Sequence, residues 1–284
     1  MIFARVSHKN QEINNKLKVL PIKSFCILLL IVSLCWIGPF FSPYEFDFID
    51  WENMATPPNF QNHHYFGTDS MGRDLFVRTL EGGQISILVG IFASFVSLII
   101  GVLYGSVSGY IGGKTDEIMM RVVDVLYALP FMFIVLLIMI IFGSEMYLVF
   151  IAIGGYIWLD MARIVRGQTL HLKKKEFVIA SLSQGAHSFY ILVRHIFPNL
   201  ISVVIVYLTI LIPQVILIEA FLSFLGLGIQ EPATSWGALV QEGSQDMEMS
   251  PWSLIFPASF LTVTLFCFHY IGDGIRDVFD PKQK

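Results

Sequence analysis

Charged side chains are scarce in this sequence. Aspartate, glutamate, lysine and arginine together make up 14% of its 284 residues, whereas about a quarter is usual in a soluble domain. So few charges cannot cover a folded surface that faces water, which excludes a soluble enzyme. The formal net charge of −4 gives no basis for binding nucleic acid. Long uncharged runs favour a helical membrane bundle instead.

Groups that mark catalytic and metal sites are also missing. The three cysteines all lie in apolar runs, with neither zinc-ligand spacing nor a disulfide framework. The sequence contains no Gly-x-Ser-x-Gly and no His-Glu-x-x-His motif. Residues 109–115 miss the spacing of a phosphate-binding loop by one position. His63 and His64 have no second pair of ligands nearby, so we expect solvated histidines and no metal bound by this chain.

Six apolar stretches can cross a bilayer, for which a helix needs about 20 residues. They cover residues 24–44, 85–113, 125–144, 146–159 with a continuation to 162, 200–218 with a continuation past Glu219 to 228, and 249–272. The first stretch follows a basic tail and is longer than the core of a signal peptide, so we expect an uncleaved span. The sequence therefore predicts an all-α, polytopic membrane protein with six transmembrane helices.

The positions of lysine and arginine predict the orientation. If residues 1–23 are cytoplasmic, 16 of the 18 basic residues fall on the cytoplasmic side. Only Arg73 and Arg78 then lie outside, in the external segment 45–84. Basic residues favour the cytoplasmic side of membrane proteins. We therefore expect both tails, 1–23 and 273–284, to be cytoplasmic.

The external segment contains a run of mixed polar residues, 66–74, just before the second span. Its spacing predicts a short helix capped by Thr68 or Asp69. It also places two acids one helical turn before a base, Asp69 before Arg73 and Asp74 before Arg78. A surface helix leading into the membrane and a shaped element beside a pore both fit this pattern.

The cytoplasmic segment 163–199 combines basic residues with two short helical patterns. The first covers 176–184 and ends at Gly185-Ala186, and the second covers 188–196 and is stopped by Pro198. Two short helices joined by a glycine turn form a compact knob that suits a groove in a partner protein. An interfacial helix pair without a partner fits the pattern equally well.

Glu219 is the one acid deep within an apolar run, and such acids are functional candidates. It could act as a proton relay in a secondary transporter. It could also be a structural carboxylate near the outer end of the fifth span, paired with a polar neighbour. Because no residue of opposite charge lies in any predicted span, we favour the structural role.

Four separated stretches together resemble one family, the permease subunits of bacterial ABC importers for dipeptides, oligopeptides and nickel. The external run resembles the signature Gly-Thr-Asp-x-x-Gly-Arg-Asp of that family, with matches at Gly67, Thr68, Asp69, Gly72, Arg73 and Asp74. The other stretches are 162–168, 223–228 followed by 235–237, and 272–277 with 280–281. The resemblance runs from about residue 20 to the end of the chain.

The resemblance implies a function for the cytoplasmic knob, because importer permeases carry an ATPase-coupling motif at this place. In this chain the motif positions fall on Ala180, Ser181, Gly185, the following Ala186, and the closing Pro198. The acid of the motif is replaced by Ile179. Glu176, one turn earlier, is the candidate for supplying a carboxylate on the same face.

The resemblance further implies a type I ABC importer transmembrane domain over residues 85–272, with a coupling region at 163–199. Such a subunit forms half of a heterodimeric pore in the bacterial inner membrane and has no catalytic residues. It is surrounded by lipid, and its implied partners are a second permease, two ATP-binding subunits that hold ATP and Mg, and an extracytoplasmic solute-binding protein.

The substrate stays open at this point. Dipeptides or oligopeptides are our first expectation, and nickel or a metal chelate is the alternative within the family. Outside it, an ion-gradient-driven secondary transporter or a membrane scaffold without a transport role would also be helical and apolar.

Overall fold

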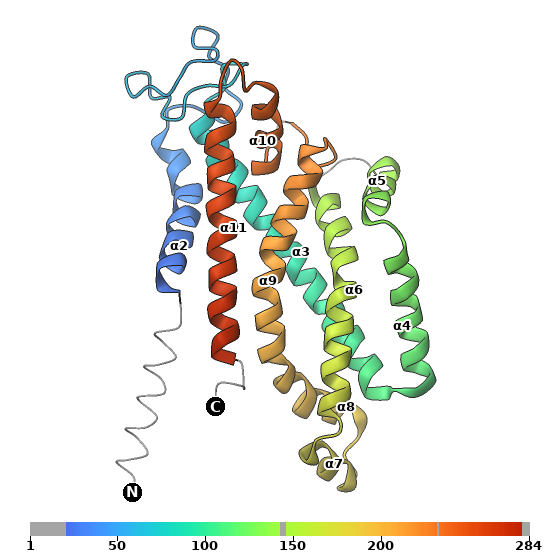
Figure 1. The fold of residues 1–284 in the computed structure, drawn as a ribbon. Coiled ribbons are helices and arrows are strands. Elements are labelled where there is room, and N and C mark those ends of the chain that lie inside the picture. The colour runs from blue at the N-terminus through green and yellow to red at the C-terminus, as the bar shows by residue number, and fades with distance from the viewer. Residues whose placement is uncertain (1–20, 143–145, 232, 280–284) are drawn as a thin grey trace, which may run out of the picture. The chain divides into compact units, whose positions relative to one another are not determined.

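The computed structural model describes residues 21–142, 146–231 and 233–279, and the described part is helical without extended strands (Figure 1). By their internal contacts the residues form two compact units. One consists of residues 1–84 and 239–284, and the other of residues 85–238. Helix α3 (Leu75–Ile111) and helix α10 (Trp236–Gln245) each contribute residues to both units.

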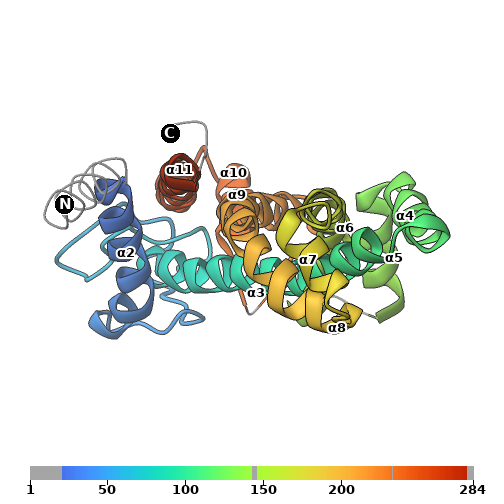
Figure 2. The ribbon, with the colours of Figure 1, turned by 90° about the horizontal axis from the view of Figure 1, so that it is seen from below.

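The unit of residues 85–238 contains most of α3 and the helices between it and α10. These are α4 (Gly113–Ala128), α5 (Phe131–Phe142), α6 (Met146–Leu172), α7 (Glu176–Ser183), α8 (Ser188–Ile191) and α9 (Phe197–Phe224). Helix α6 packs against α4, α5 and α9. Helices α7 and α8 lie at the lower end of α6 and α9 in Figure 1 and face the viewer in Figure 2, which is seen from below. Its core is apolar and includes Val89, Val149, Ile153, Leu211 and Val215.

Glycines let α3 approach α6 closely. Gly101, Gly105 and Gly109 follow each other at intervals of one helical turn, so they share one face of α3. A Cβ atom at these positions would overlap the Met161 side chain, the Ala162 carbonyl and the Thr169 side chain, respectively. Small residues spaced in this way are typical of membrane helices whose backbones nearly touch.

The unit of residues 1–84 and 239–284 is built around α2 (Ile22–Ile37), which packs along α11 (Trp252–Phe279). A short 3₁₀ turn, Gly38–Phe41, ends α2. The external segment that follows is irregular, with three isolated bridges. Phe66 of this segment stacks on Phe256 of α11, with ring centroids 4.1 Å apart.

Among the described residues, five helices are long and apolar enough to cross a membrane, or six if α4 and α5 count as one bent span. The predicted third span, 125–144, is not one helix, because the chain bends by 81° between α4 and α5. Pro130 stands at this bend and Leu129 before it is extended, with φ −77° and ψ 132°. Proline has no N–H and disfavours helical geometry in the residue before it. The end of that predicted span, residues 143–144, lies outside the described residues.

Several helices extend beyond the predicted apolar stretches. Helix α3 begins at Leu75, ten residues before the expected start of the second span at 85, and α6 continues to Leu172. The predicted cytoplasmic segment therefore begins inside a helix. Arg163 lies inside α6, where its side chain pairs with Asp124 of α4 at 2.8 Å.

Pro198 does not stop the second helix of the cytoplasmic knob, contrary to the prediction. Helix α8 passes through a π-helical turn, Leu192–Ile196, directly into α9. Pro198 lies two residues after this π-helical turn, so the helical hydrogen-bond pattern changes next to the residue that has no N–H to donate. The stretch from Ser188 to Phe224 is one continuous helical rod of 37 residues.

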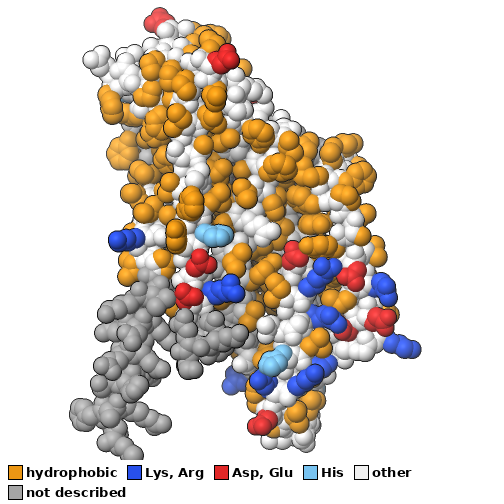
Figure 3. Space-filling view, viewed as in Figure 1, with side chains coloured by type: hydrophobic (Ala, Val, Ile, Leu, Met, Phe, Trp, Pro, Cys, Tyr) orange, Lys and Arg blue, Asp and Glu red, His pale blue; other side chains and the backbone are white. Residues whose placement is uncertain are grey.

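In the view of Figure 3, hydrophobic side chains cover most of the exposed surface of the helices. In the most apolar windows of α2 and α11, only 17% of each window is buried within the chain. Helices that are apolar all round and poorly covered by their own chain are typical of membrane proteins.

Candidate functional site

Asp69 is the centre of the external run, which forms a turn and not the predicted helix. Its carboxylate accepts hydrogen bonds from the backbone N–H groups of Met71 and Arg73, at 2.9 and 2.8 Å. Arg73 Nε donates to it at 2.7 Å, so the predicted Asp69–Arg73 pair is present. Arg78 Nη1 also donates to Asp69, at 2.6 Å. Arg78 therefore pairs with Asp69, whereas the sequence predicted Asp74.

Glu242 of α10 completes this group, although no motif in the sequence pointed to it. Its two carboxylate oxygens accept from Arg73 Nη2 and Arg78 Nη2, each at 3.1 Å. Arg78 is only 2% exposed. Two arginines thus face two carboxylates, and buried charges are tolerated when they are paired and hydrogen-bonded in this way. The group ties the external segment to α10.

The remaining residues of the external run fix its backbone. Thr68 accepts a hydrogen bond from the Thr56 N–H at 2.9 Å and donates to the carbonyl of Asn53. Trp252 of α11 donates from its indole Nε1 to the Thr68 carbonyl at 2.9 Å. Gly67 and Gly72 have φ values of +79° and +81°. The run is therefore a structural connection between the external segment and α11.

Asp74 caps α3 and holds a buried histidine. Its carboxylate accepts from the Val77 N–H at 3.0 Å, and its other oxygen lies 2.8 Å from Nδ1 of His64. His64 is fully buried and stacks on Tyr44 at 4.3 Å, so the expectation of a solvated histidine is wrong for this residue. Its other ring nitrogen is 3.5 Å from Asp50. Burial raises the pKa of the Asp74 carboxyl, and the hydrogen bond with His64 opposes that rise.

Glu219 lies in α9 and is fully buried. Its two carboxylate oxygens contact two serine hydroxyls, Ser223 Oγ at 2.7 Å and Ser86 Oγ at 3.2 Å. Ser223 is on α9, one turn further along, and Ser86 is on α3. The carboxylate has polar neighbours, which is the arrangement of the structural alternative considered for this residue.

A second layer of contacts joins Glu219 to the start of α10. Ser86 Oγ accepts a hydrogen bond from the Trp236 N–H at 3.1 Å. Ser235 Oγ lies 3.3 Å from Ser223 Oγ and accepts from the Ala238 N–H at 3.2 Å. Ser235 therefore caps the N-terminus of α10. We call Glu219, Ser86, Ser223 and Ser235 the Glu219 cluster.

The family-like stretches 223–228 and 235–237 fold together at this cluster. A Cβ at Gly228 would overlap Ser223, and a Cβ at Gly237 would overlap the backbone of Ala220. The absence of these two side chains lets the connection after α9 lie directly against the helix. The resemblance to the family pointed to these stretches, but nothing in the sequence indicated that they surround Glu219. The sequence did contain a signal for α10: serine often caps helices, and Ser235 comes directly before the amphipathic stretch 236–245.

The coupling region presents a knob made of α7, a glycine turn and α8. After α7 the Gly185 N–H bonds to the Leu182 carbonyl at 2.9 Å, and the Ala186 N–H bonds to the Ser181 carbonyl at 3.1 Å. This pair of bonds is a Schellman motif, which requires a left-handed residue. Gly185 has a φ of +81° and supplies it. The sequence prediction of a glycine break at this position is confirmed.

The knob is anchored on one side and exposed on the other. Val178 and Ile191 are buried in a cluster with Met161, Val165 and Leu200 of α6 and α9. Other large apolar side chains of the knob are exposed, namely Phe177, Ile179, Leu182, Phe189 and Tyr190. Of the predicted coupling residues, Glu176, Ala180, Gly185 and Pro198 are exposed, and Ser181 and Ala186 are half-buried.

Two arginines of stretch 162–168 hold α4 beside α6, a role that the sequence did not indicate. Arg166 donates to both oxygens of Asp116, at 2.6 and 2.7 Å, and Ser108 of α3 donates to Asp116 at 2.5 Å. Arg163 pairs with Asp124 and lies over the ring of Tyr127 at 4.3 Å. The two acids are eight residues apart on α4, so they share the face toward α6.

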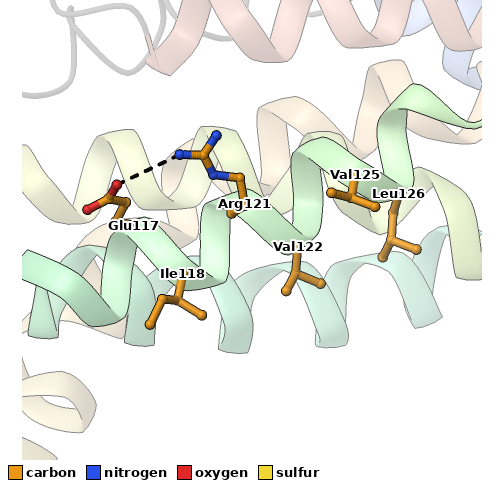
Figure 4. Close-up of a pocket in the computed structure, with 6 residues that line it drawn as sticks. All are labelled: Glu117, Ile118, Arg121, Val122, Val125 and Leu126. Carbon is orange, nitrogen blue, oxygen red and sulfur yellow. Dashed lines mark ion pairs between the residues drawn. The ribbon is translucent and has the colours of Figure 1, made fainter.

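The other face of α4 carries a shallow groove of about 350 Å³ (Figure 4). All six lining residues belong to α4: Glu117, Ile118, Arg121, Val122, Val125 and Leu126. Glu117 and Arg121 form an exposed ion pair at 3.8 Å. A groove formed by one helix is an open surface and not an enclosed solute site. Among the described residues, no three His, Cys, Asp or Glu side chains are placed to hold a metal ion.

Comparison with known proteins decides the family. Residues 97–284 match the family described as the binding-protein-dependent transport system inner membrane component. This chain belongs to that family. The match includes the coupling region, Glu219 and α10, whereas the external run at 66–74 precedes it. The predicted family is thereby confirmed.

Relatives of this inner membrane component match over most of the chain. The oligopeptide transport system permease protein OppC of Haemophilus influenzae is 52% identical over 263 residues, which are 93% of this chain and 85% of that protein. The dipeptide transport system permease protein DppC of Bacillus subtilis is 42% identical over 259 residues, which are 91% and 80% of the two chains.

A solved structure shows the same fold. The MetNI methionine ABC transporter in an inward-facing conformation matches with a TM-score of 0.53 at 18% identity, over 72% of this chain and 95% of that one. The all-α fold of an ABC importer transmembrane domain is therefore confirmed. The chain is a multi-pass inner membrane permease subunit, a kind of subunit that is not itself catalytic.

Proposed function

We propose that this permease forms half of the translocation pore of an ATP-driven importer for dipeptides or oligopeptides. The observation that supports the substrate class is the similarity to OppC and DppC over more than nine-tenths of the chain. Nickel or a metal chelate as substrate, and transport driven by an ion gradient, are supported by no observation on this chain. They are outcomes that the experiment below distinguishes.

The exposed side of the knob is the proposed contact for a separate ATP-binding subunit. Phe189 is 71% exposed and Ile179 52% exposed, although neither lies in a predicted span. Large apolar side chains outside the membrane favour burial against a partner protein. Ile179 stands where the family motif has an acid, so the proposed contact is apolar at this position. Glu176 in the first turn of α7 is the nearest carboxylate.

The proposed assembly contains two ATP-binding subunits, a second homologous permease and an extracytoplasmic binding protein. ATP and Mg belong to the ATP-binding subunits, and this chain holds no cofactor of its own. Both chain termini are cytoplasmic in this proposal, because that orientation places most basic residues inside. The external segment and α10 then face the binding protein, and lipid covers the apolar helices around the bundle.

The proposed mechanism uses the continuous helix from α8 into α9. Closure of the ATP-binding subunits on ATP moves the knob, and the motion enters α9 through its backbone. The pore then changes between inward and outward access, and the binding protein releases its peptide into the outward state. ATP inside and liganded binding protein outside bias one two-state element, as alternating access requires.

Reconstitution tests the proposal. The permease, its second permease, the ATP-binding subunits and the binding protein are placed in lipid vesicles, and uptake of a labelled tripeptide is measured. We expect uptake that requires ATP and competes with unlabelled peptides. Uptake displaced by Ni²⁺ but not by peptides would contradict the substrate. Accumulation by the permease alone, or with a proton gradient and no ATP, would contradict the mechanism.

A further inference from the structure

The Glu219 cluster connects three helices through one carboxylate. Glu219 and Ser223 belong to α9, Ser86 belongs to α3, and Ser235 caps α10. All four side chains are at most 4% exposed. The proposed transport cycle uses none of them, although a fully buried acid in an apolar helix is costly to keep.

The directions of the hydrogen bonds follow from the donors. The Trp236 and Ala238 N–H groups can only donate, so Ser86 Oγ and Ser235 Oγ accept from them. Each serine has one proton left to donate. Ser86 donates it to one oxygen of Glu219. Ser235 donates to Ser223, which donates to the other oxygen.

Two chains of hydrogen bonds, which we call relays, therefore start at backbone N–H groups in the first turn of α10. They end on the two carboxylate oxygens of Glu219. A carboxylate is the side chain that can accept at both ends. Glutamine could accept at one end only. At the other end its NH₂ group would donate to a serine hydroxyl, which would then lose the acceptor for its own proton. An apolar residue would leave both serine hydroxyls without their acceptor.

We propose that Glu219 is a positioning residue, which fixes the start of α10 to the outer part of α9 so that movement of α9 is passed to α10 during transport. This inference rests on the proposed function, in which α10 lies on the external side and faces the binding protein. Gly228 and Gly237 support it, because they bring the connection after α9 into direct backbone contact with that helix.

The positioning is tested on the purified full chain in lipid nanodiscs by hydrogen exchange. The variants are Glu219→Ala, Glu219→Gln and Ser86→Ala. We expect the amides at the start of α10, those of Trp236 and Ala238 above all, to exchange at least tenfold faster in each variant. Ser94→Ala is the matched control. Ser94 is also a buried serine of α3, and its hydroxyl has no hydrogen-bond partner in the described structure.

The functional part is tested in the reconstituted importer by the amount of solute moved per ATP hydrolysed. We expect this ratio to fall severalfold in Ser86→Ala and Glu219→Gln, while ATP hydrolysis without binding protein is unchanged. Ser86→Ala should add no further loss in a Glu219→Ala background, because both residues act on α10 through the same relay. A residue that only supports folding would lower assembly, hydrolysis and transport together.

The outcomes separate this inference from the proposed function. Unchanged exchange at the start of α10 in Glu219→Ala overturns the positioning, whatever the solute. Faster exchange with an unchanged solute-to-ATP ratio overturns the link to transport. If the wild-type complex moves no peptide under ATP, the proposed function fails, whereas the exchange measurement still decides whether Glu219 holds α10.

Discussion

Arg78 of α3 donates to Asp69, nine residues earlier in the chain, at 2.6 Å, rather than to the acid one helical turn before it. The external segment folds back over the start of α3, and this reversal brings Asp69 to Arg78. Arg73 and Glu242 complete the group. Two buried charges, Asp69 and Arg78, and two half-buried ones, Arg73 and Glu242, hold together residues that are far apart in the sequence.

Replacing Arg78 with methionine should destabilise the fold of the external segment. The substitution keeps most of the side-chain volume but leaves Asp69 and Glu242 with one arginine between them. Removing one member of a buried charge group costs about 3–5 kcal/mol. Thermal unfolding of the purified permease in detergent measures the loss. The control is Arg121→Met, since the exposed pair with Glu117 contributes at most about 0.5 kcal/mol. Equal melting temperatures for the two variants would contradict the prediction.

Replacing Gly105 with leucine should separate α3 from α6. A side chain at this position meets the Ala162 carbonyl and cannot be accommodated by a rotamer change alone. Overpacking of this kind costs about 1–3 kcal/mol or more. The expected result is a lower melting temperature and a lower yield of monodisperse protein. Gly155→Leu on α6 is the control, because no atom lies within 4 Å of a Cβ built there. The prediction fails if both variants behave alike.

Replacing Gly185 with valine should uncouple ATP hydrolysis from transport while the chain still inserts. A β-branched residue is strained at a φ of +81°, so the Schellman turn must open and the orientation of α7 relative to α8 must change. The measurement is uptake per ATP hydrolysed in the reconstituted complex. Gly167→Val, at an exposed position inside α6, provides the control with the same change of side chain. Normal coupling in Gly185→Val would show that the turn has no such role.

Replacing Phe189 with aspartate should weaken assembly with the ATP-binding subunit. The side chain is 71% exposed, so the change costs the isolated permease little, but it places a charge in the proposed apolar contact. Co-purification of the ATP-binding subunit should fall at least tenfold, with an unchanged melting temperature of the permease alone. Val178→Ala is the comparison variant, because Val178 is buried in the permease itself. It should lower the melting temperature of the permease, and co-purification should fall only as far as the permease is destabilised. Full co-purification of Phe189→Asp would exclude Phe189 from the contact.

Local features of the sequence predicted much of the fold. Length and hydropathy located the apolar spans. The turn at Gly185 was predictable because glycine is the usual residue for the left-handed position at the end of a helix. The helix ends were predicted poorly, because the end of an apolar run marks the edge of the membrane and not the end of a helix. Arg163 ends an apolar run in the sequence, yet α6 continues to Leu172.

Contacts between distant residues could not be predicted from one sequence. His64 was expected to be solvated, but Asp74 and the ring of Tyr44 bury it. Glu219 was recognised as unusual from its position alone. Its partners Ser86 and Ser235 lie 133 residues before it and 16 residues after it, and ordinary serines give no signal of their own. Spacing predicts neighbours on one helix, whereas these side chains meet only after the chain has folded.

The uninterrupted backbone from Ser188 to Phe224 has a mechanical consequence. A loop between α8 and α9 would absorb a displacement of the knob by changing its own dihedral angles. In the proposed transport cycle, a displacement at Phe189 would therefore pass into α9 through helical backbone, with no loop between them. The turn at Gly185 sets the angle between α7 and α8, so in that cycle it would decide how a movement of α7 reaches α9.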